Sequence, residues 1–144
     1  MRVVVDTNIV FSAILNSSGL IGELLLNSND QFEFYAPDFL EQELNKYLPK
    51  LMKATSMNDR QVAISIRQIL KKIKIISSEI IHPEAWTSAY ELARRVDEKD
   101  TPFVAVAITL NAILWTGDKK LAVGLGDQSD LRILNSRELL AVRK

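Results

Sequence analysis

The stretch Val3-Val4-Val5-Asp6 decides the fold of this chain. Three consecutive β-branched residues form an apolar run without polar alternation, which is typical of a parallel strand covered on both faces. The run stops at Asp6, and Thr7 and Asn8 follow it. Parallel strands need long crossover connections, usually helices, so this stretch predicts an α/β protein.

Similar apolar runs recur along the chain between segments of helical periodicity. Further strands are predicted over residues 32–36, 73–76, 113–116 and 131–134. Helices are predicted over residues 20–26, from Asp38 to about residue 52, over residues 58–72, from Pro83, over residues 103–110 and from Ser136. We expect Pro37 to stop the second strand and Pro49 to kink or end its helix, because proline lacks a backbone N–H donor.

The alternation of strands and helices predicts the layers of the fold. Residues 103–110 are apolar nearly all round, as expected of a helix packed inside the protein. Strands separated by helices pair in parallel with right-handed crossovers. The predicted fold is therefore a three-layer α/β/α sandwich with a central parallel sheet of about five strands.

Length and composition predict a single domain over residues 1–144. The chain is 47% hydrophobic, and a chain of this size buries roughly 70% of its unfolded surface. Its 18 basic and 18 acidic residues cancel, so binding of a polyanion would require local basic patches. The absence of cysteine excludes disulfides and sulfur-ligated zinc. Without a signal-like segment or a run of roughly 20 apolar residues, we expect a cytoplasmic protein that does not enter membranes.

Four acidic residues stand where this fold can gather them. Asp6 and Asp118 directly follow strands, Asp100 precedes the apolar helix, and Glu43 borders the apolar stripe of its helix. Ligands of open parallel sheets bind beyond the carboxyl ends of the strands. Carboxylates brought together repel one another and favour a hard divalent cation. The pattern predicts metal-assisted chemistry on phosphate.

Each acid also has a structural reading, and two positions have a competitor. Asp6 and Asp118 are common turn or helix-cap residues, and Asp100 can support a helix start. Asp97 competes with Asp100 for the third position. Glu41 competes with Glu43, although the helical phase favours Glu43.

Four short motifs occur in one order along essentially the whole chain. They are Val5-Asp6-Thr7-Asn8, Glu41-Gln42-Glu43-Leu44, Asp97-Glu98-Lys99-Asp100-Thr101-Pro102-Phe103 and Trp115-Thr116-Gly117-Asp118-Lys119-Lys120-Leu121. With these motifs the chain resembles the PIN-domain ribonucleases, and among them the toxin components of bacterial and archaeal toxin–antitoxin pairs.

The resemblance implies a single nuclease domain with a defined set of site residues. Asp6, Glu43, Asp100 and Asp118 match the catalytic, metal-binding acids, and Asn8, Thr116 and Asp97 have supporting positions. It further implies an endoribonuclease that uses Mg²⁺ or Mn²⁺ and leaves a 5′-phosphate and a free 3′-hydroxyl. The implied partners are RNA, a cognate antitoxin and a second copy of the chain, for which the apolar residues around Trp86 are a candidate surface.

Two lysines and two alternative functions complete the prediction. Lys119 and Lys120 adjoin Asp118, which makes them candidates for binding nucleic acid. A phosphatase of the haloacid-dehalogenase type would require an acid where Asn8 stands and another shortly after Asp118, where residues 119–123 offer none. A catalytically silent scaffold that binds RNA or protein is the other alternative, although none of the four acids is missing.

Overall fold

β1 (Arg2–Val5) is the central strand of a parallel sheet. The computed structural model describes residues 1–126 and 130–143, and in these residues the sheet has five strands in the order β3-β2-β1-β4-β5. The other strands are β2 (Glu33–Pro37), β3 (Ile73–Ile76), β4 (Ile113–Trp115) and β5 (Ile133–Leu134). Every neighbouring pair is parallel, as predicted. Val3, Val4 and Val5 are fully buried, which confirms that β1 is covered on both faces.

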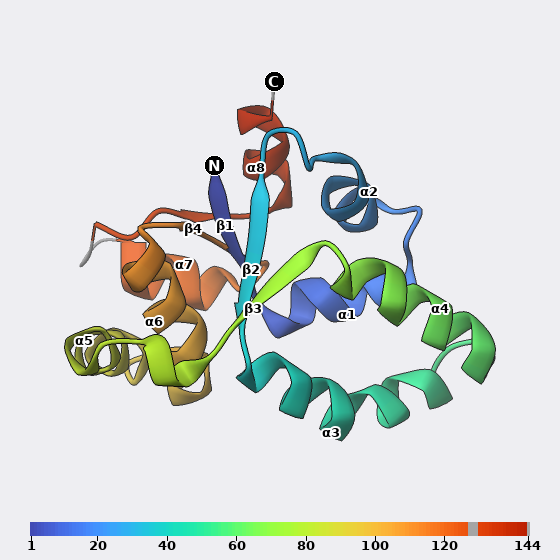
Figure 1. Ribbon diagram of the computed structural model, residues 1–144, viewed down its shortest axis with the longest axis horizontal. Coiled ribbons are helices and arrows are strands. Elements are labelled where there is room, and N and C mark those ends of the chain that lie inside the picture. The colour runs from blue at the N-terminus through green and yellow to red at the C-terminus, as the bar shows by residue number, and fades with distance from the viewer. Residues whose placement is uncertain (127–129, 144) are drawn as a thin grey trace.

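Helices cover both faces of the sheet (Figure 1). One layer contains α1 (Thr7–Leu15), α2 (Leu20–Asn27), α3 (Phe39–Lys53) and α4 (Asp59–Leu70), in which α1 packs against the other three. The opposite layer contains α5 (Pro83–Ala93), α6 (Thr101–Leu110) and α7 (Lys119–Gly126). α8 (Ser136–Val142) packs against α2 and β5. The α/β/α prediction is confirmed.

The position of α6 explains its composition. α6 packs against β1, β2 and β4 on one side and α5 on the other, so it is apolar nearly all round. It ends at Asn111, whose left-handed backbone (φ 50°, ψ 50°) lets its N–H donate to the carbonyls of Ala107 and Ile108. This turn leads through Ala112 directly into β4.

α3 does not end at Pro49, whereas β2 does end at Pro37, one residue later than predicted. α3 continues past Pro49 to Lys53, because proline removes one helical hydrogen bond while Leu48, Leu51 and Met52 still pack against the core. Pro37 belongs to β2 as its last residue, in register with Ile76. A strand end tolerates the missing donor.

Two helices were not predicted. α1 follows β1 directly, and it is rich in β-branched and aromatic residues that favour strands. α7 contains Gly124 and Gly126, which are unfavourable inside helices. Short 3₁₀ turns, Ser78–Ile80 and Glu98–Asp100, precede α5 and α6. Among the described helices none alone is long and apolar enough to cross a membrane; α1 and α2 together reach that length and composition but bend by 100°.

Candidate active site

Asp6 is held rigidly where β1 passes into α1. One carboxylate oxygen accepts a hydrogen bond from the Ile9 amide at 2.8 Å and so caps α1. The other accepts a hydrogen bond from the Thr116 hydroxyl. Asp6 is 7% exposed, and burial raises its pKa; the two hydrogen bonds oppose this rise, and the charges of Asp118 and Glu43 add to it.

The sheet register brings Asp6 and Thr116 together. Val5 and Trp115 are partners on the adjacent central strands β1 and β4, so the residues after them emerge side by side at the carboxyl edge. The Asp6 amide donates to the Trp115 carbonyl at 3.3 Å, which extends the pairing by one step. Two segments 110 residues apart thus form the core of the site.

Glu43 reaches the same edge from α3. Its Oε1 accepts a hydrogen bond from the Thr7 hydroxyl at 2.5 Å, which ties α3 to the first residue of α1. Thr7 is buried and Glu43 is half-buried, whereas Glu41 is exposed. The structure therefore places Glu43 rather than Glu41 beside Asp6.

Asp100 is the residue before α6, yet it does not cap that helix with its side chain. Its carboxylate is half-buried, and burial together with the charges of Asp97, Asp6, Asp118 and Glu43 raises its pKa to about 7. Asp97 instead accepts a hydrogen bond from the Lys99 amide at 3.0 Å and is exposed. Asp100 thus faces the other acids, and Asp97 lies at the rim.

Asp118 lies slightly apart from the other three acids, at the start of α7. Its carboxylate caps the start of α7 by accepting hydrogen bonds from the amides of Lys120 (2.9 Å) and Leu121 (3.2 Å). Its own amide donates to the Thr116 hydroxyl at 3.0 Å, so Thr116 connects it to Asp6. The Asp118 charge nevertheless raises the pKa of Asp6 and of Asp100.

A cavity of about 420 Å³ lies over these acids. Asp6, Glu43, Asp97, Asp100 and Asn8 line it, whereas Asp118 and Thr116 are not in its lining. The remaining lining residues are Thr7, Phe11, Tyr47, Lys50, Leu51 and Lys99. Sequence reasoning missed these, although residues 47, 50 and 51 follow Glu43 at the spacing of one helical face.

The carboxylate oxygens at this cavity are ligands that suit a hard divalent cation. The described side chains, however, are not arranged around one common position for such an ion. In residues 1–126 and 130–143 no group of three or more Asp, Glu, His or Cys side chains has the arrangement of a metal site. Each Asp6 oxygen accepts one hydrogen bond and keeps a further lone pair, and Asp100 is free of any cap. Asp100, whose carboxylate makes no cap hydrogen bond, is the side chain that would have to rotate to complete a coordination shell.

Lys119 and Lys120 directly follow Asp118 and lie outside the lining of the acidic cavity. Both are exposed at the start of α7, where together with Arg95 of the α5–α6 connection and the 72% exposed Val123 they line a shallow basic depression. The described residues give neither lysine an ion-pair partner. Their ammonium groups are therefore available to an anionic ligand.

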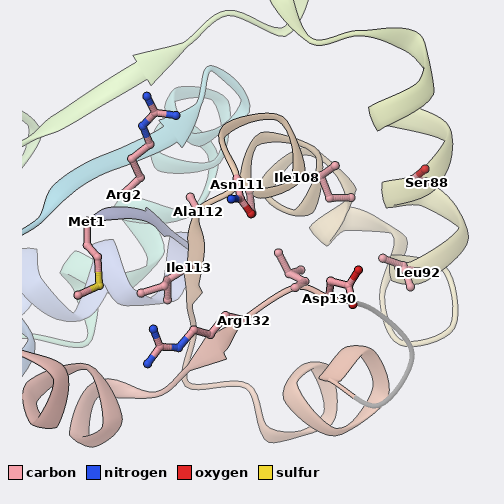
Figure 2. A pocket seen from close by; sticks show the side chains of 12 residues that line it. Met1, Arg2, Ser88, Leu92, Ile108, Asn111, Ala112, Ile113, Asp130 and Arg132 are labelled. Carbon is pink, nitrogen blue, oxygen red and sulfur yellow. The ribbon is translucent and has the colours of Figure 1, made fainter.

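A second cavity, of about 480 Å³, opens at the opposite edge of the sheet (Figure 2). Leu92, Ile108 and Ile113 give it an apolar wall, and Arg2 and Arg132 contribute basic groups. Asp130 is the sole carboxylate of its lining among the described residues. None of the predicted site residues lies there, so this cavity does not compete with the acidic cleft.

Comparisons with known proteins identify the family and agree with the fold. The sequence profile of the PIN domain family matches residues 4–137. The chain is 32% identical over 142 residues to the protein MJ1680 of Methanocaldococcus jannaschii, covering 96% of this chain and 84% of that one.

Solved structures share the fold at low sequence identity. PAE2754 from Pyrobaculum aerophilum superposes with a TM-score of 0.68 at 14% identity, over 99% of this chain and 88% of that one. VapBC-1 from nontypeable Haemophilus influenzae gives 0.67 at 18% identity, over 95% and 99%. VapBC2 from Rickettsia felis, solved bound to a DNA fragment from their promoter, gives 0.63 at 20% identity, over 94% and 98%.

Proposed function

Because this chain belongs to the PIN domain family, a family of nucleases, we propose that it is a metal-dependent endoribonuclease and the toxin of a toxin–antitoxin pair. One observation carries the proposal. Asp6, Glu43 and Asp100, from three separate elements, line one cavity, and burial and mutual repulsion raise the pKa of Asp6 and Asp100. A divalent cation relieves both effects.

The proposed ligands are Asp6, Glu43, Asp100 and Asp118, with Mg²⁺ or Mn²⁺ as the cation, because carboxylate oxygens suit these hard ions. When bound, such an ion lowers the pKa of a water molecule and neutralises the charge of a phosphate. Thr116 and Ile9 hold Asp6 in one orientation, and Thr7 holds Glu43. Fixed carboxylates keep the geometry of the site from being rebuilt at each turnover.

The lysines supply the electrostatic attraction that the neutral net charge does not. Lys119 and Lys120 are exposed beside Asp118, where phosphates of an RNA strand crossing the site would lie. Each contact with a phosphate releases counterions, so binding should weaken as salt rises.

A metal titration with a mixed RNA pool tests the proposal. Wild type should cleave RNA in Mg²⁺ or Mn²⁺, and Asp6→Asn should lose this activity, because amide nitrogen is a poor ligand for a hard ion. Asp30→Asn, an exposed aspartate in the turn before β2, is the matched control and should cleave like wild type. Products should carry a 5′-phosphate.

The same titration separates the alternatives. Cleavage that persists in chelator contradicts metal dependence. Folded wild type that binds RNA but never cuts it would support the silent scaffold. Membership of the family leaves the phosphatase alternative without support, since Asn8 lines the cavity where that class needs an acid.

The partner proposal rests on fold similarity to two VapBC assemblies. We propose a protein antitoxin that holds the nuclease inactive in the cytoplasm, and a homodimer as the form of the toxin. Expression of wild type in a bacterial host should arrest growth, whereas Asp6→Asn should not. Growth arrest by both proteins would mean that toxicity does not come from this site.

A further inference from the structure

The second cavity, at the edge of the sheet opposite the acidic cleft, has apolar walls that are only partly covered. Leu92 of α5, Ile108 of α6 and Leu131 before β5 are half-buried, and Ile113, the first residue of β4, is 5% exposed. The cavity volume of about 480 Å³ lies in the range of about 300 to 1,000 Å³ in which small ligands bind. A ligand that covers these side chains removes further apolar surface from water.

The exposed part of the lining is mostly polar. Apart from Met1, it consists of Arg2, Ser88, Asn111, Asp130 and Arg132. A protein interface needs roughly 800 Å² of surface from each partner, usually with an apolar centre. The apolar surface here stays within the cavity, which suits a small ligand better than a protein partner.

Two arginines belong to the lining, but only one is engaged. The Nη1 atom of Arg2 donates to the Leu110 carbonyl at 3.1 Å. Leu110 is the last residue of α6, where unpaired carbonyls carry partial negative charge, so this guanidinium already has a partner. The side chain of Arg132 has no hydrogen bond or ion pair within residues 1–126 and 130–143. Its guanidinium keeps the donors that hold a carboxylate in a bidentate pair.

The charges at this cavity are separated (Figure 2). The Arg132 guanidinium points toward the side of Met1 and Ile113, whereas the Asp130 carboxylate lies on the side of Leu92. An anion therefore finds a free cation at one end only, and a second negative charge at the other end would be repelled by Asp130. The ligand that fits carries one negative charge at one end and an apolar body along the wall.

We propose that this cavity binds a small apolar carboxylate of about the size of octanoate. The carboxylate contacts the Arg132 guanidinium, and the apolar body covers Leu92, Ile108 and Ile113. Asp130 is exposed and stays hydrated at the other end. No residue of the acidic cleft takes part, so the inference goes beyond the proposed nuclease function and does not depend on it.

The lining comes together only in the folded chain. Its residues belong to β1, α5, α6, β4 and the segment before β5, and they lie between positions 1 and 132 of the sequence. The unfolded chain offers no such cavity. A bound carboxylate should therefore raise the melting temperature.

Fluorescence titration with anilinonaphthalene sulfonate, an apolar ring system with one anionic group, tests the site. Wild type should bind the probe saturably, and octanoate should displace it at lower concentration than octanol, which has the same chain and no charge. Arg132→Gln should weaken binding of the probe and of octanoate by about threefold to tenfold, as expected for one charge-assisted contact at an exposed position. Arg137→Gln, an exposed arginine of α8 outside the lining, is the control and should bind like wild type.

A blocking variant tests the apolar part of the site. Ser88 and Leu92 are four residues apart, so they lie on one face of α5. Ser88→Trp should fill the opening and weaken binding of both ligands by about tenfold or more. Thr87→Trp, exposed on α5 but outside the lining, is the control and should bind like wild type.

Thermal melts without ligand check that each variant is folded. Octanoate should raise the melting temperature of wild type and both controls, and it should raise that of Arg132→Gln and Ser88→Trp by less. Unchanged binding by Arg132→Gln, or displacement of the probe by octanol as effective as by octanoate, overturns the recognition of an anion. Unchanged binding by Ser88→Trp would place the probe elsewhere on the protein and overturns the site as well.

Discussion

Thr116 is a single residue through which two acids of the site are connected. Its hydroxyl donates to Asp6 and accepts from the Asp118 amide, and the side chain is 2% exposed. A hydroxyl is suited to this position because it donates and accepts at once. The orientation of the buried Asp6 carboxylate therefore depends on a residue that contributes no charge.

Replacing Thr116 by valine keeps the shape and removes the hydroxyl. Asp6 then loses a donor in a buried place, so its pKa should rise further and binding of Mn²⁺ should weaken by about tenfold or more. Thr116→Ser keeps the hydroxyl and should stay close to wild type. Calorimetric titration with Mn²⁺ checks this. Equal affinity of the valine variant and wild type would show that the hydrogen bond does not orient the ligand.

Asp100 should make the metal-free protein less stable as pH rises. Its pKa is about 7 in the folded protein against the ordinary value of 3.8, so between these pH values the folded state keeps a proton that the unfolded chain releases. The free energy of unfolding therefore falls with rising pH across this window. Asp100→Asn should remove this decrease. After allowance for solvent screening, the free energy of unfolding of the variant should exceed that of wild type by on the order of 1 kcal/mol at neutral pH and should equal it at about pH 4.

Denaturant titrations in chelator across this pH range measure the difference. Glu98→Gln, an exposed neighbour in the same 3₁₀ turn, is the control and should follow the wild-type curve. Parallel curves for Asp100→Asn and wild type would mean that Asp100 is already ionised in the folded protein.

Among the elements, α6 shows how a helix end positions a strand. Asn111 closes α6 in the left-handed region, and β4 starts two residues later. Asparagine and glycine adopt this conformation readily, while alanine is strained in it.

Asn111→Ala should lower the free energy of unfolding by about 1 kcal/mol, whereas Asn111→Gly should be close to neutral. Denaturant midpoints of the two variants and wild type decide this. Because Asn111 lies far from the acidic cleft in the fold, RNA cleavage at low temperature should be unaffected in both. An alanine variant as stable as the glycine variant would contradict the strain.

The elements also show what sequence alone predicts and what it does not. The β-branched run at β1 and the all-round apolar pattern of α6 predicted their burial, because both are covered on all sides. α1 was missed because its residues favour strands locally, and the Asp6 cap and contacts with three helices determine its structure. Pro49 stays helical for the same tertiary reason.

The site could be predicted in part. Helical phase favoured Glu43 over Glu41, and the structure places Glu43 on the cavity. The role of Thr7 and the place of Phe11 in the cavity lining could not be inferred, since they depend on how α1 and α3 cross. The raised pKa of Asp100 likewise depends on the fold, because it comes first from burial of the carboxylate and then from the charges of the neighbouring acids.

At the scale of the whole molecule, the chain has no net charge, but its acidic and basic residues are grouped in different places. Acids gather in one cleft, while Lys50, Lys99, Lys119 and Lys120 stand around it. A cation bound in this cleft should therefore stabilise the folded state as a whole, because the unfolded chain offers no such cluster.

At about 100 times its dissociation constant, Mg²⁺ or Mn²⁺ should add about 2.7 kcal/mol and raise the melting temperature by roughly 5 to 10 °C. Ca²⁺ should stabilise the protein without supporting comparable cleavage. Asp6→Asn should lose most of the shift, and thermal melts with each ion and with chelator measure it. Identical melts of wild type in Mg²⁺, Mn²⁺ and chelator would exclude a metal site in this cleft.

The central place of β1 has a consequence for the chain while it is being made. β1 leaves the ribosome before its neighbour β4, and the hydroxyl partner of Asp6 follows 110 residues later. At common rates of translation this interval lasts on the order of 10 s. A nascent chain thus carries Asp6 without its partners, and a truncated product ending before β4 holds no complete set of acids. With the proposed ligand set, we expect nuclease activity to begin only when synthesis has passed Asp118, so an incomplete chain should not cleave the RNA around it.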